Sequence, residues 1–189
     1  MAREYHARTM ERVAYTTFRT ALGHCGLAWN DAGLVAVQLP ERSAAATAAR
    51  LRSRFPGARR RLATRPVRQA RAAIVRLLAG GRDHLSAIHL DLSGCSPFFR
   101  KVYEITRTIP PGETLSYGEL AALAGNPHAA RAVGQAMARN PFPLLVPCHR
   151  VLAAGGGAGG FSAPGGVGTK FRLLRIEGAL PQRELPLGR

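Results

Sequence analysis

The apolar side chains of residues 15–39 are arranged as expected for β-strands. Residues 15–39 are dominated by apolar stretches that flank the segment Asn30-Asp31-Ala32-Gly33, a composition typical of a hairpin turn. Pro40 closes the second of these strands, because proline cannot donate to a ladder. Further along, residues 88–92 alternate between apolar and polar, which predicts a half-buried strand.

Two segments between these strands have the pattern of helices. Residues 41–55 are rich in Ala and Arg without Gly or Pro, and Pro56-Gly57 ends them. Residues 66–79 place apolar side chains on one helical face and are followed by Gly80-Gly81. Together with the strands, these helices predict a small α/β domain over residues 1–93.

The second half of the chain is predicted to be mainly helical. Residues 98–108 carry apolar side chains at helical spacing and stop before Pro110-Pro111-Gly112. We place a domain over residues 94–180 and a frayed tail over residues 181–189.

Two short helices with a tight turn follow. Ser116 and Glu119 fit the capping box, in which each caps the backbone at the start of a helix. That helix is expected to stop at Gly125, where Asn126 can cap a second helix with Pro127 in its first turn. The second helix is expected to run over residues 128–137. Such a pair is a helix-turn-helix pattern.

The second helix has an unusual surface, in which small residues surround a single long cation. Small side chains allow close approach to a nucleic-acid groove, and Arg131 could enter a base stack. An Ala-rich helix packed against a neighbour, with Arg131 in solvent, explains the pattern equally well. The small residues in question are Ala129, Ala130, Ala132 and Gly134.

Composition adds a strong positive charge. Lys and Arg number 27 against 11 acidic residues, a net charge of +16 that attracts polyanions. Coding bias toward Arg is an alternative explanation. No apolar run is as long as a membrane span, and the first twelve residues lack the apolar core of a secretory signal, so we expect a cytoplasmic protein without membrane contact. Three widely separated cysteines fit neither a disulfide framework nor a zinc knuckle.

One cysteine lies in a segment with catalytic character. The apolar run 144–146 predicts a buried strand or extended segment, and it leads into Pro147-Cys148-His149-Arg150-Val151. A cysteine is a strong nucleophile only as thiolate, so it needs a nearby base. Consecutive side chains in a helical turn diverge by about 100°, so a water bridge from Cys148 to His149 is more natural than a direct bond. Glu177, after a predicted helix over 169–176, is the candidate acid that orients His149.

Two other interpretations of this segment stay open on these residues alone. Cys148 could be a buried apolar side chain with His149 as a satisfied polar neighbour, or the pair could serve an unrelated Cys/His hydrolase. The second would leave the segment from Tyr117 to Asn140 unexplained.

The longer pattern resembles the O6-alkylguanine-DNA alkyltransferases. The resemblance covers about residues 96–178. It is carried by Ser116-Tyr117, Leu120 to Pro127, Ala129 to Gly134, Asn140-Pro141, Pro147 to Val151, Gly159 to Ser162, Gly165-Gly166, Lys170, Leu173-Leu174 and Glu177-Gly178.

The resemblance implies a catalytic role for five residues. Cys148 would accept the alkyl group, and His149 would help remove the thiol proton through a water. Glu177 would hold His149 in a hydrogen-bond network supported by Asn140. Tyr117 would contact the flipped guanine or its phosphate and donate a hydrogen bond as the base leaves.

The resemblance also implies how DNA and substrate are held. The second helix would enter the minor groove of double-stranded DNA, and Arg131 would fill the space left by the flipped nucleotide. The carbonyls of Cys148 and Val151 would accept from the guanine amino group, and the Ser162 amide would address O6. DNA contacts would come from Tyr117, Ala129, Ala130, Arg131 and Gly134, and the pocket would be lined by Pro147, Val151, Phe161 and Ser162.

A ribonuclease H-like first domain and a winged-helix-like second domain are implied as well. The implied function is direct-reversal DNA repair, in which the methyl or larger alkyl group of O6-alkylguanine, with O4-alkylthymine as a second candidate, is moved irreversibly to Cys148 in a single turnover. A monomer without any cofactor would suffice. The alternative within this group is a non-catalytic damage-binding protein of the alkyltransferase-like type, which carries Trp at the nucleophile position.

Two features qualify the resemblance. The loop over residues 161–170 is about two residues longer than in some relatives, which leaves the width of the alkyl pocket open. Some relatives hold a structural zinc in the first domain, but Cys25, His24 and His89 do not make a matching ligand set, so we predict no metal.

Overall fold

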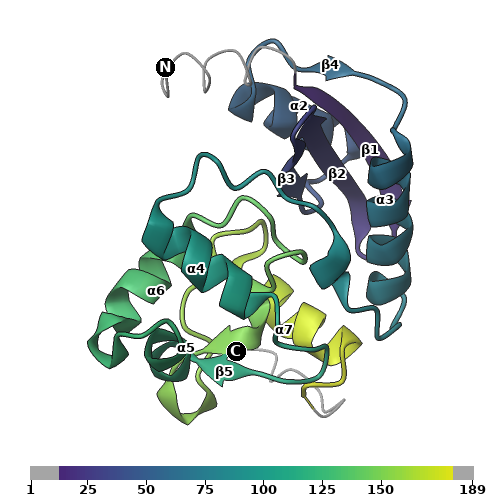
Figure 1. Cartoon of the computed structure of the whole chain (residues 1–189). Helices are drawn as coiled ribbons and strands as arrows, with labels where there is room; N and C mark the ends of the chain where they lie inside the picture. The colour runs from purple at the N-terminus through teal and green to yellow at the C-terminus, as the bar shows by residue number, and fades with distance from the viewer. Residues whose placement is uncertain (1–12, 181–189) are drawn as a thin grey trace.

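The computed structural model describes residues 13–180, which form a sheet-and-helix half and a helical half (Figure 1). The predicted tail over residues 181–189 and the first twelve residues lie outside this range. The first half contains a four-stranded sheet in the order β3-β2-β1-β4. Its strands are β1 (Ala14–Thr20), β2 (Gly23–Asn30), β3 (Gly33–Gln38) and β4 (Arg59–Arg60). The first three are antiparallel neighbours, and β4 runs parallel to β1.

The predicted hairpin turn joins β2 to β3, as the sequence indicated. The Asn30 side chain accepts from the backbone amides of Ala32 and Gly33 at 2.9 and 3.0 Å, which fixes the turn locally. Gly33 has φ of +143°, a backbone conformation that favours glycine.

Helices cover both faces of this sheet. On one face, Leu51 of α2 (Ala44–Arg54) packs with Tyr15 and Ala28. On the other, Ile74 of α3 (Arg65–Leu78) joins the larger core. Burial on both sides explains why β2 and β3 read as apolar stretches rather than as alternating strands. The coarse prediction of a small sheet with helices is therefore confirmed.

The strand predicted over residues 88–92 is wrong. Only one bridge forms there, between Leu34 and Leu90, after a 3₁₀ turn, η1 (Leu85–Ala87). The Asp91 carboxylate accepts from the Asn30 side chain at 2.9 Å and from the Ser93 amide at 3.0 Å. The local bond from the Ser93 amide to Asp91 turns the backbone away before a ladder can extend.

The second half is mainly helical, as predicted. Its two-stranded parallel sheet pairs β5 (Leu115–Ser116) with β6 (Val151–Leu152). Four helices and three 3₁₀ turns complete it: α4 (Pro97–Thr106), α5 (Tyr117–Leu123), η2 (Pro127–Ala129), α6 (Ala130–Ala138), η3 (Cys148–Arg150), η4 (Ala154–Gly156) and α7 (Gly166–Ile176).

The predicted helix caps are present. Ser116 and Glu119 form the reciprocal capping box, with bonds of 3.1 and 2.6 Å. The Asn126 side chain accepts from the His128 amide at 3.1 Å. However, residues 127–129 form the 3₁₀ turn η2, so α6 begins at Ala130 rather than at residue 128.

A strand over residues 144–146 is not formed, because this segment is a buried turn. Leu144 has φ of +75°, which is incompatible with a strand, and the Val146 amide donates to the Phe142 carbonyl at 2.7 Å. The segment also joins the two halves, since the Val37 amide donates to the Pro141 carbonyl at 2.9 Å.

One apolar core runs through both halves and includes Leu27, Ile74, Val102 and Leu173. The domain boundary near residue 93 therefore stays a prediction. Within residues 13–180, no helix has both the length and the apolar character to cross a membrane.

Candidate active site

Cys148 opens the 3₁₀ turn η3 directly after Pro147, which occupies the N-cap position. Only 7% of Cys148 is exposed, yet it lines two cavities that meet at this residue. The first cavity has a volume of about 550 Å³ and is bordered by α6. Its lining residues are Tyr117, Ala130, Arg131, Gly134, Met137, Ala138, Cys148, Gly160, Phe161 and Ser162.

The second cavity, of about 800 Å³, extends from Cys148 toward the first half of the chain. It shares Phe161 and Ser162 with the first cavity and reaches Arg50 and Arg54 of α2. The Ser162 hydroxyl donates to the Ala138 carbonyl at 2.9 Å, between residues that both cavities share.

The Cys148 thiol is protonated in its resting environment. Burial raises the pKa of the thiol, while hydrogen bonding by Asn140 and the charge of Lys170 oppose this effect. A base is therefore needed to generate the thiolate.

Behind Cys148 lies a buried network of His149, Arg150 and Glu177. His149 Nε2 is 2.9 Å from Glu177 Oε1, and Arg150 donates to both oxygens of the same carboxylate at 2.8 and 2.7 Å. Burial raises the pKa of Glu177, but the bonds from Arg150 and His149 outweigh it and lower the pKa to about 2. Glu177 is thus ionised, and its charge is balanced by Arg150.

The bond to Glu177 decides which nitrogen of His149 is basic. Burial lowers the pKa of His149, so the imidazole is neutral. Because Nε2 faces an ionised carboxylate, the proton is assigned to Nε2 and the lone pair to Nδ1. Nδ1 is buried without a hydrogen-bond partner among residues 13–180. His149, the residue after Cys148, is thus a neutral imidazole whose Nδ1 can accept a proton.

Asn140 has a different place from the one that the resemblance implied. It forms no hydrogen bond to His149 or Glu177 within the described part of the chain. Instead it donates to the Val146 carbonyl at 2.8 Å and accepts from the Phe142 amide at 2.9 Å. Asn140 therefore shapes the loop before Cys148 and contacts the thiol itself.

Sequence reasoning gave no role to Lys170 or Arg150. Lys170 is fully buried on α7, and its ammonium donates to the Val151 carbonyl at 2.6 Å and lies 5.8 Å from the centre of the Tyr117 ring. Burial lowers the pKa of Lys170 to about 8. Lys and Arg are almost never fully buried unless they are paired, so a reader of the sequence places them at the surface. Their position beside the site became visible only in the tertiary structure.

Tyr117 and the loop after η4 enclose the first cavity. A Cβ at Gly159 would lie 2.8 Å from the Tyr117 ring, so only glycine fits against this side chain. Burial raises the pKa of Tyr117, which keeps the phenol protonated as a hydrogen-bond donor.

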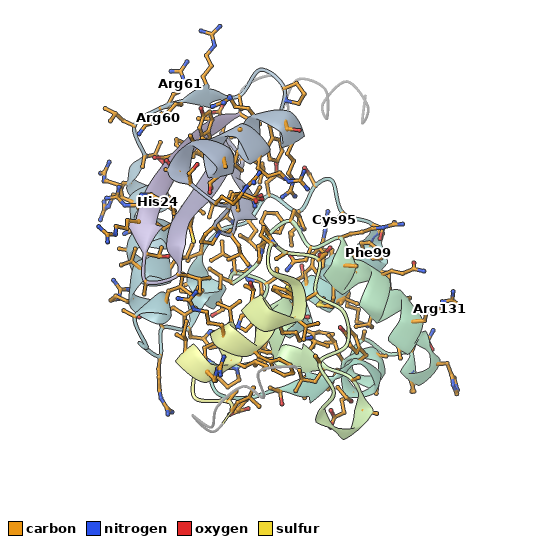
Figure 2. All side chains as sticks on the ribbon, turned by 180° about the vertical axis from the view of Figure 1, so that it is seen from behind. His24, Arg60, Arg61, Cys95, Phe99 and Arg131 are labelled. Carbon is orange, nitrogen blue, oxygen red and sulfur yellow. The ribbon has the colours of Figure 1, made fainter. Side chains whose placement is uncertain are left out.

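One wall of this cavity is formed by α6, where Ala130 and Gly134 line it. Ala130 and the preceding Ala129 of η2 are half-buried, and a Cβ at Gly134 would meet open space. Arg131 is exposed and points away from the body of the molecule (Figure 2). This surface lies beside the mouth of a cavity that leads to Cys148.

The other two cysteines lie outside the site. Cys25 is buried in the first half, where burial raises the pKa of its thiol to about 11, and Cys95 is half-buried. In the described range, no three His, Cys, Asp or Glu side chains gather as a possible metal site.

Comparison with known proteins identifies the second half of the chain first. Residues 97–179 match the family described as 6-O-methylguanine DNA methyltransferase, DNA binding domain. Two relatives named methylated-DNA–protein-cysteine methyltransferase cover this region. The one from Methanothermobacter thermautotrophicus is 48% identical over 89 residues, 47% of this chain and 48% of that protein. The one from Mycobacterium leprae is 50% identical over 91 residues, 48% of this chain and 53% of that protein.

A solved structure extends the similarity to both halves. The crystal structure of Mycobacterium tuberculosis OGT in complex with DNA has a TM-score of 0.72 and 32% sequence identity, covering 88% of this chain and 93% of that one. The chain therefore belongs to the O6-methylguanine DNA methyltransferase family, which confirms the resemblance in the sequence motifs. The sequence matches to the curated relatives span about half of their length.

Proposed function

We propose that this protein repairs DNA directly, by moving the alkyl group of O6-alkylguanine irreversibly to its own Cys148. The observation that carries the proposal is the position of the Cys148 thiol, at the junction of two cavities and backed by a buried imidazole–carboxylate pair. The names of the curated relatives support the same activity.

The chemical step needs the residues of the site and one bridging water. His149 Nδ1 takes the thiol proton through a water, and Glu177 stabilises the imidazolium that forms. The sulfur then attacks the alkyl carbon, so that a C–S bond forms as the bond from carbon to O6 breaks. Tyr117 donates a hydrogen bond to the departing guanine, which finally receives the proton taken from the thiol. The thioether product has no easy hydrolytic exit, so each molecule acts once.

The guanine must leave the base stack to reach Cys148. Extrusion of a base costs a few kcal/mol, and we assign the compensating contact to Arg131 at the mouth of the first cavity. In this proposal, α5, η2 and α6 act as a helix-turn-helix whose second helix enters the minor groove. Ala130 and Gly134 permit the close approach. The DNA complex of the Mycobacterium tuberculosis relative supports DNA as the partner.

Of the four predicted pocket residues, Phe161 and Ser162 line both cavities, whereas Pro147 and Val151 line neither of these two. Because Ser162 lines the same cavities as Cys148, we assign the Ser162 amide to O6. The Val151 carbonyl already accepts from Lys170, and its second lone pair is the one left for the guanine amino group. The second cavity gives room for alkyl groups larger than methyl.

Finer features of the fold are proposed too. The antiparallel order β3-β2-β1 with β4 parallel to β1 supports a ribonuclease H-like first domain. The three helices α4, α5 and α6 contact one another, and α5 also contacts the β5–β6 pair, which supports a winged-helix-like second domain. We also propose a cytoplasmic monomer that needs no cofactor.

A direct test is methyl transfer followed by peptide mass mapping. Incubation with duplex DNA that contains O6-methylguanine should add one methyl mass to the peptide that contains Cys148. Cys148→Ala should abolish the transfer while leaving binding to DNA intact. An unchanged mass with folded wild-type protein would reject the proposal. Binding without transfer would favour the non-catalytic damage-binding alternative, which a cysteine at position 148 disfavours.

A further inference from the structure

Much of the positive charge lies outside the candidate active site. Residues 42–82 contain twelve arginines and no Asp, Glu or Lys, in a chain whose net charge is +16. Several of these arginines are tied into the fold. Arg52 donates to the Tyr15 hydroxyl at 3.1 Å, Arg54 lies 5.4 Å from the centre of the Phe55 ring, and Arg76 pairs with Asp83 at 2.7 Å.

Six others form what we call the arginine surface, on and between β4 and α3. All six are exposed, and within the described range only Arg68 has a side-chain hydrogen bond, to the Ala63 carbonyl at 2.8 Å. The six residues are Arg59, Arg60, Arg61, Arg65, Arg68 and Arg71.

The arginine surface is shaped to meet a row of negative charges. Arg65, Arg68 and Arg71 follow one another at three-residue intervals on α3, which spreads them over about 9 Å of helix axis. Arg59 and Arg61 line an adjacent groove of about 830 Å³, with Asp31 as the acidic residue on its lining. Guanidinium groups bind phosphate oxygens through paired hydrogen bonds.

This surface lies far from the DNA contact proposed for α6. Figure 2 shows Arg60 and Arg61 at the opposite end of the molecule from Arg131. The arginine surface on β4 and α3 and the proposed contact on α6 thus belong to different halves of the molecule.

We propose that the arginine surface is a second duplex-binding site, so that one molecule bridges two DNA segments. Bridging of two DNA segments rests on the proposed function, since it needs the DNA contact of α6. Binding of DNA to the arginine surface does not depend on that contact. Double-stranded DNA is favoured over single strands because residues 59–71 contain no aromatic side chain on which unpaired bases could stack. Trp29 lines the same groove but is only 7% exposed, so its ring is not available for stacking. Protection of an edge strand by charge would explain Arg60 on β4, but not the arginines along α3.

A bridging assay with the full chain tests this inference. Protein is bound to a bead-linked duplex that contains O6-methylguanine, and capture of a second, fluorescent, lesion-free duplex is measured over a range of salt concentrations. The wild type should capture one second duplex per molecule. The triple variant R60Q/R61Q/R65Q should lose at least about tenfold in capture, and the slope of its log affinity against log salt should fall by about 3, as expected for three lost phosphate contacts.

A matched control removes the same charge elsewhere. R42Q/R82Q/R172Q changes three exposed arginines outside the surface and should capture the second duplex as the wild type does. Equal losses in both triple variants, or no loss in the first, would overturn the proposal.

Two further measurements separate the possible partners and the proposed function. The wild-type protein could capture no second duplex and instead sediment with phosphatidylserine vesicles, in a way that R60Q/R61Q/R65Q does not. In that case the arginine surface is a membrane contact and the DNA proposal is wrong. Methylation of Cys148 is followed in the same samples and should be unchanged in R60Q/R61Q/R65Q. Failure of methyl transfer in every sample would reject the proposed repair activity. Capture of the lesion-free duplex that is lost in R60Q/R61Q/R65Q would still support the second site.

Discussion

Two buried cations, Arg150 and Lys170, set the protonation states around Cys148. Arg150 keeps Glu177 ionised, and the ionised carboxylate in turn leaves the lone pair of His149 on Nδ1. Lys170 acts from the other side, where its charge opposes the effect of burial on the pKa of the thiol. The nucleophile therefore depends on the charge of Arg150 in η3 and on those of Lys170 and Glu177, on α7 and at its C-terminal end.

Replacing Lys170 by Met should slow alkyl transfer by shifting the ionisation of Cys148. Loss of the cation raises the pKa of the thiol, and a shift of one unit corresponds to about a tenfold lower rate at pH 7. The deficit should shrink as the pH rises above about 8, because wild-type Lys170 then loses its own charge. The measurement is the rate of self-alkylation by O6-benzylguanine between pH 6 and pH 10.

The exposed Lys101 on α4 offers the control, since Lys101→Met removes the same charge from the surface. A Lys170→Met deficit that stays constant across the pH range would contradict an electrostatic role.

At the scale of elements, the α5–η2–α6 segment is fixed by its own sequence. The capping box at Ser116 and the Asn126 cap are bonds between residues two or three positions apart. Such caps contribute about 1 kcal/mol each and need no distant partner. They orient α6 so that Arg131 stands at the mouth of the first cavity.

The variant Arg131→Ala should separate DNA chemistry from the chemistry of the thiol. We expect transfer from a duplex lesion to fall about 10- to 100-fold, since base extrusion loses a compensating contact of a few kcal/mol. Transfer from free O6-benzylguanine should stay near the wild-type rate. Single-turnover rates with both substrates provide the measurement, and Arg42→Ala is the matched surface control. Equal losses for both substrates would argue against a role in base flipping.

At the scale of the whole molecule, the Glu177 network ties distant segments together. Arg150 of η3 bonds to Glu177 after α7 and donates to the Ile109 carbonyl after α4 at 2.5 Å. Three segments thus converge on one buried ion pair. Removing one member of such a pair leaves an uncompensated charge in the interior.

Glu177→Gln should therefore lower the free energy of unfolding at pH 7 by about 3–5 kcal/mol. The carboxyl has a pKa of about 2 in the folded protein against an ordinary value of 4.5. Its stabilising effect is present above pH 4.5 and is lost as the pH falls toward 2, so the difference between wild type and variant should close over that range.

Urea unfolding at pH 7, 4 and 3 measures this difference. Glu113→Gln, at an exposed position, controls for the loss of a charge. A gap as large at pH 3 as at pH 7 would contradict the assignment of the low pKa to Glu177.

The parts of the fold that could be predicted are those held by short-range bonds. The Asn30 turn, the Ser116 capping box and the helical face of residues 66–79 were visible in the sequence because each depends on neighbours in the chain. The strand expected over residues 88–92 failed because pairing depends on a partner 56 positions away at Leu34. The two-residue strand β4 went unpredicted for the same reason.

The site divides in the same way. The amino-acid sequence alone determined the nucleophile candidate Cys148, its neighbour His149 and the small surface of α6, since these depend on residue type and spacing. Only the tertiary structure decided that Arg150 and Lys170 are buried beside the thiol, that two cavities meet there, and that the arginine surface lies far from Arg131. A pKa depends on burial and on charges brought together from far along the chain. Neither of these can be derived from the residues that neighbour the group in the sequence.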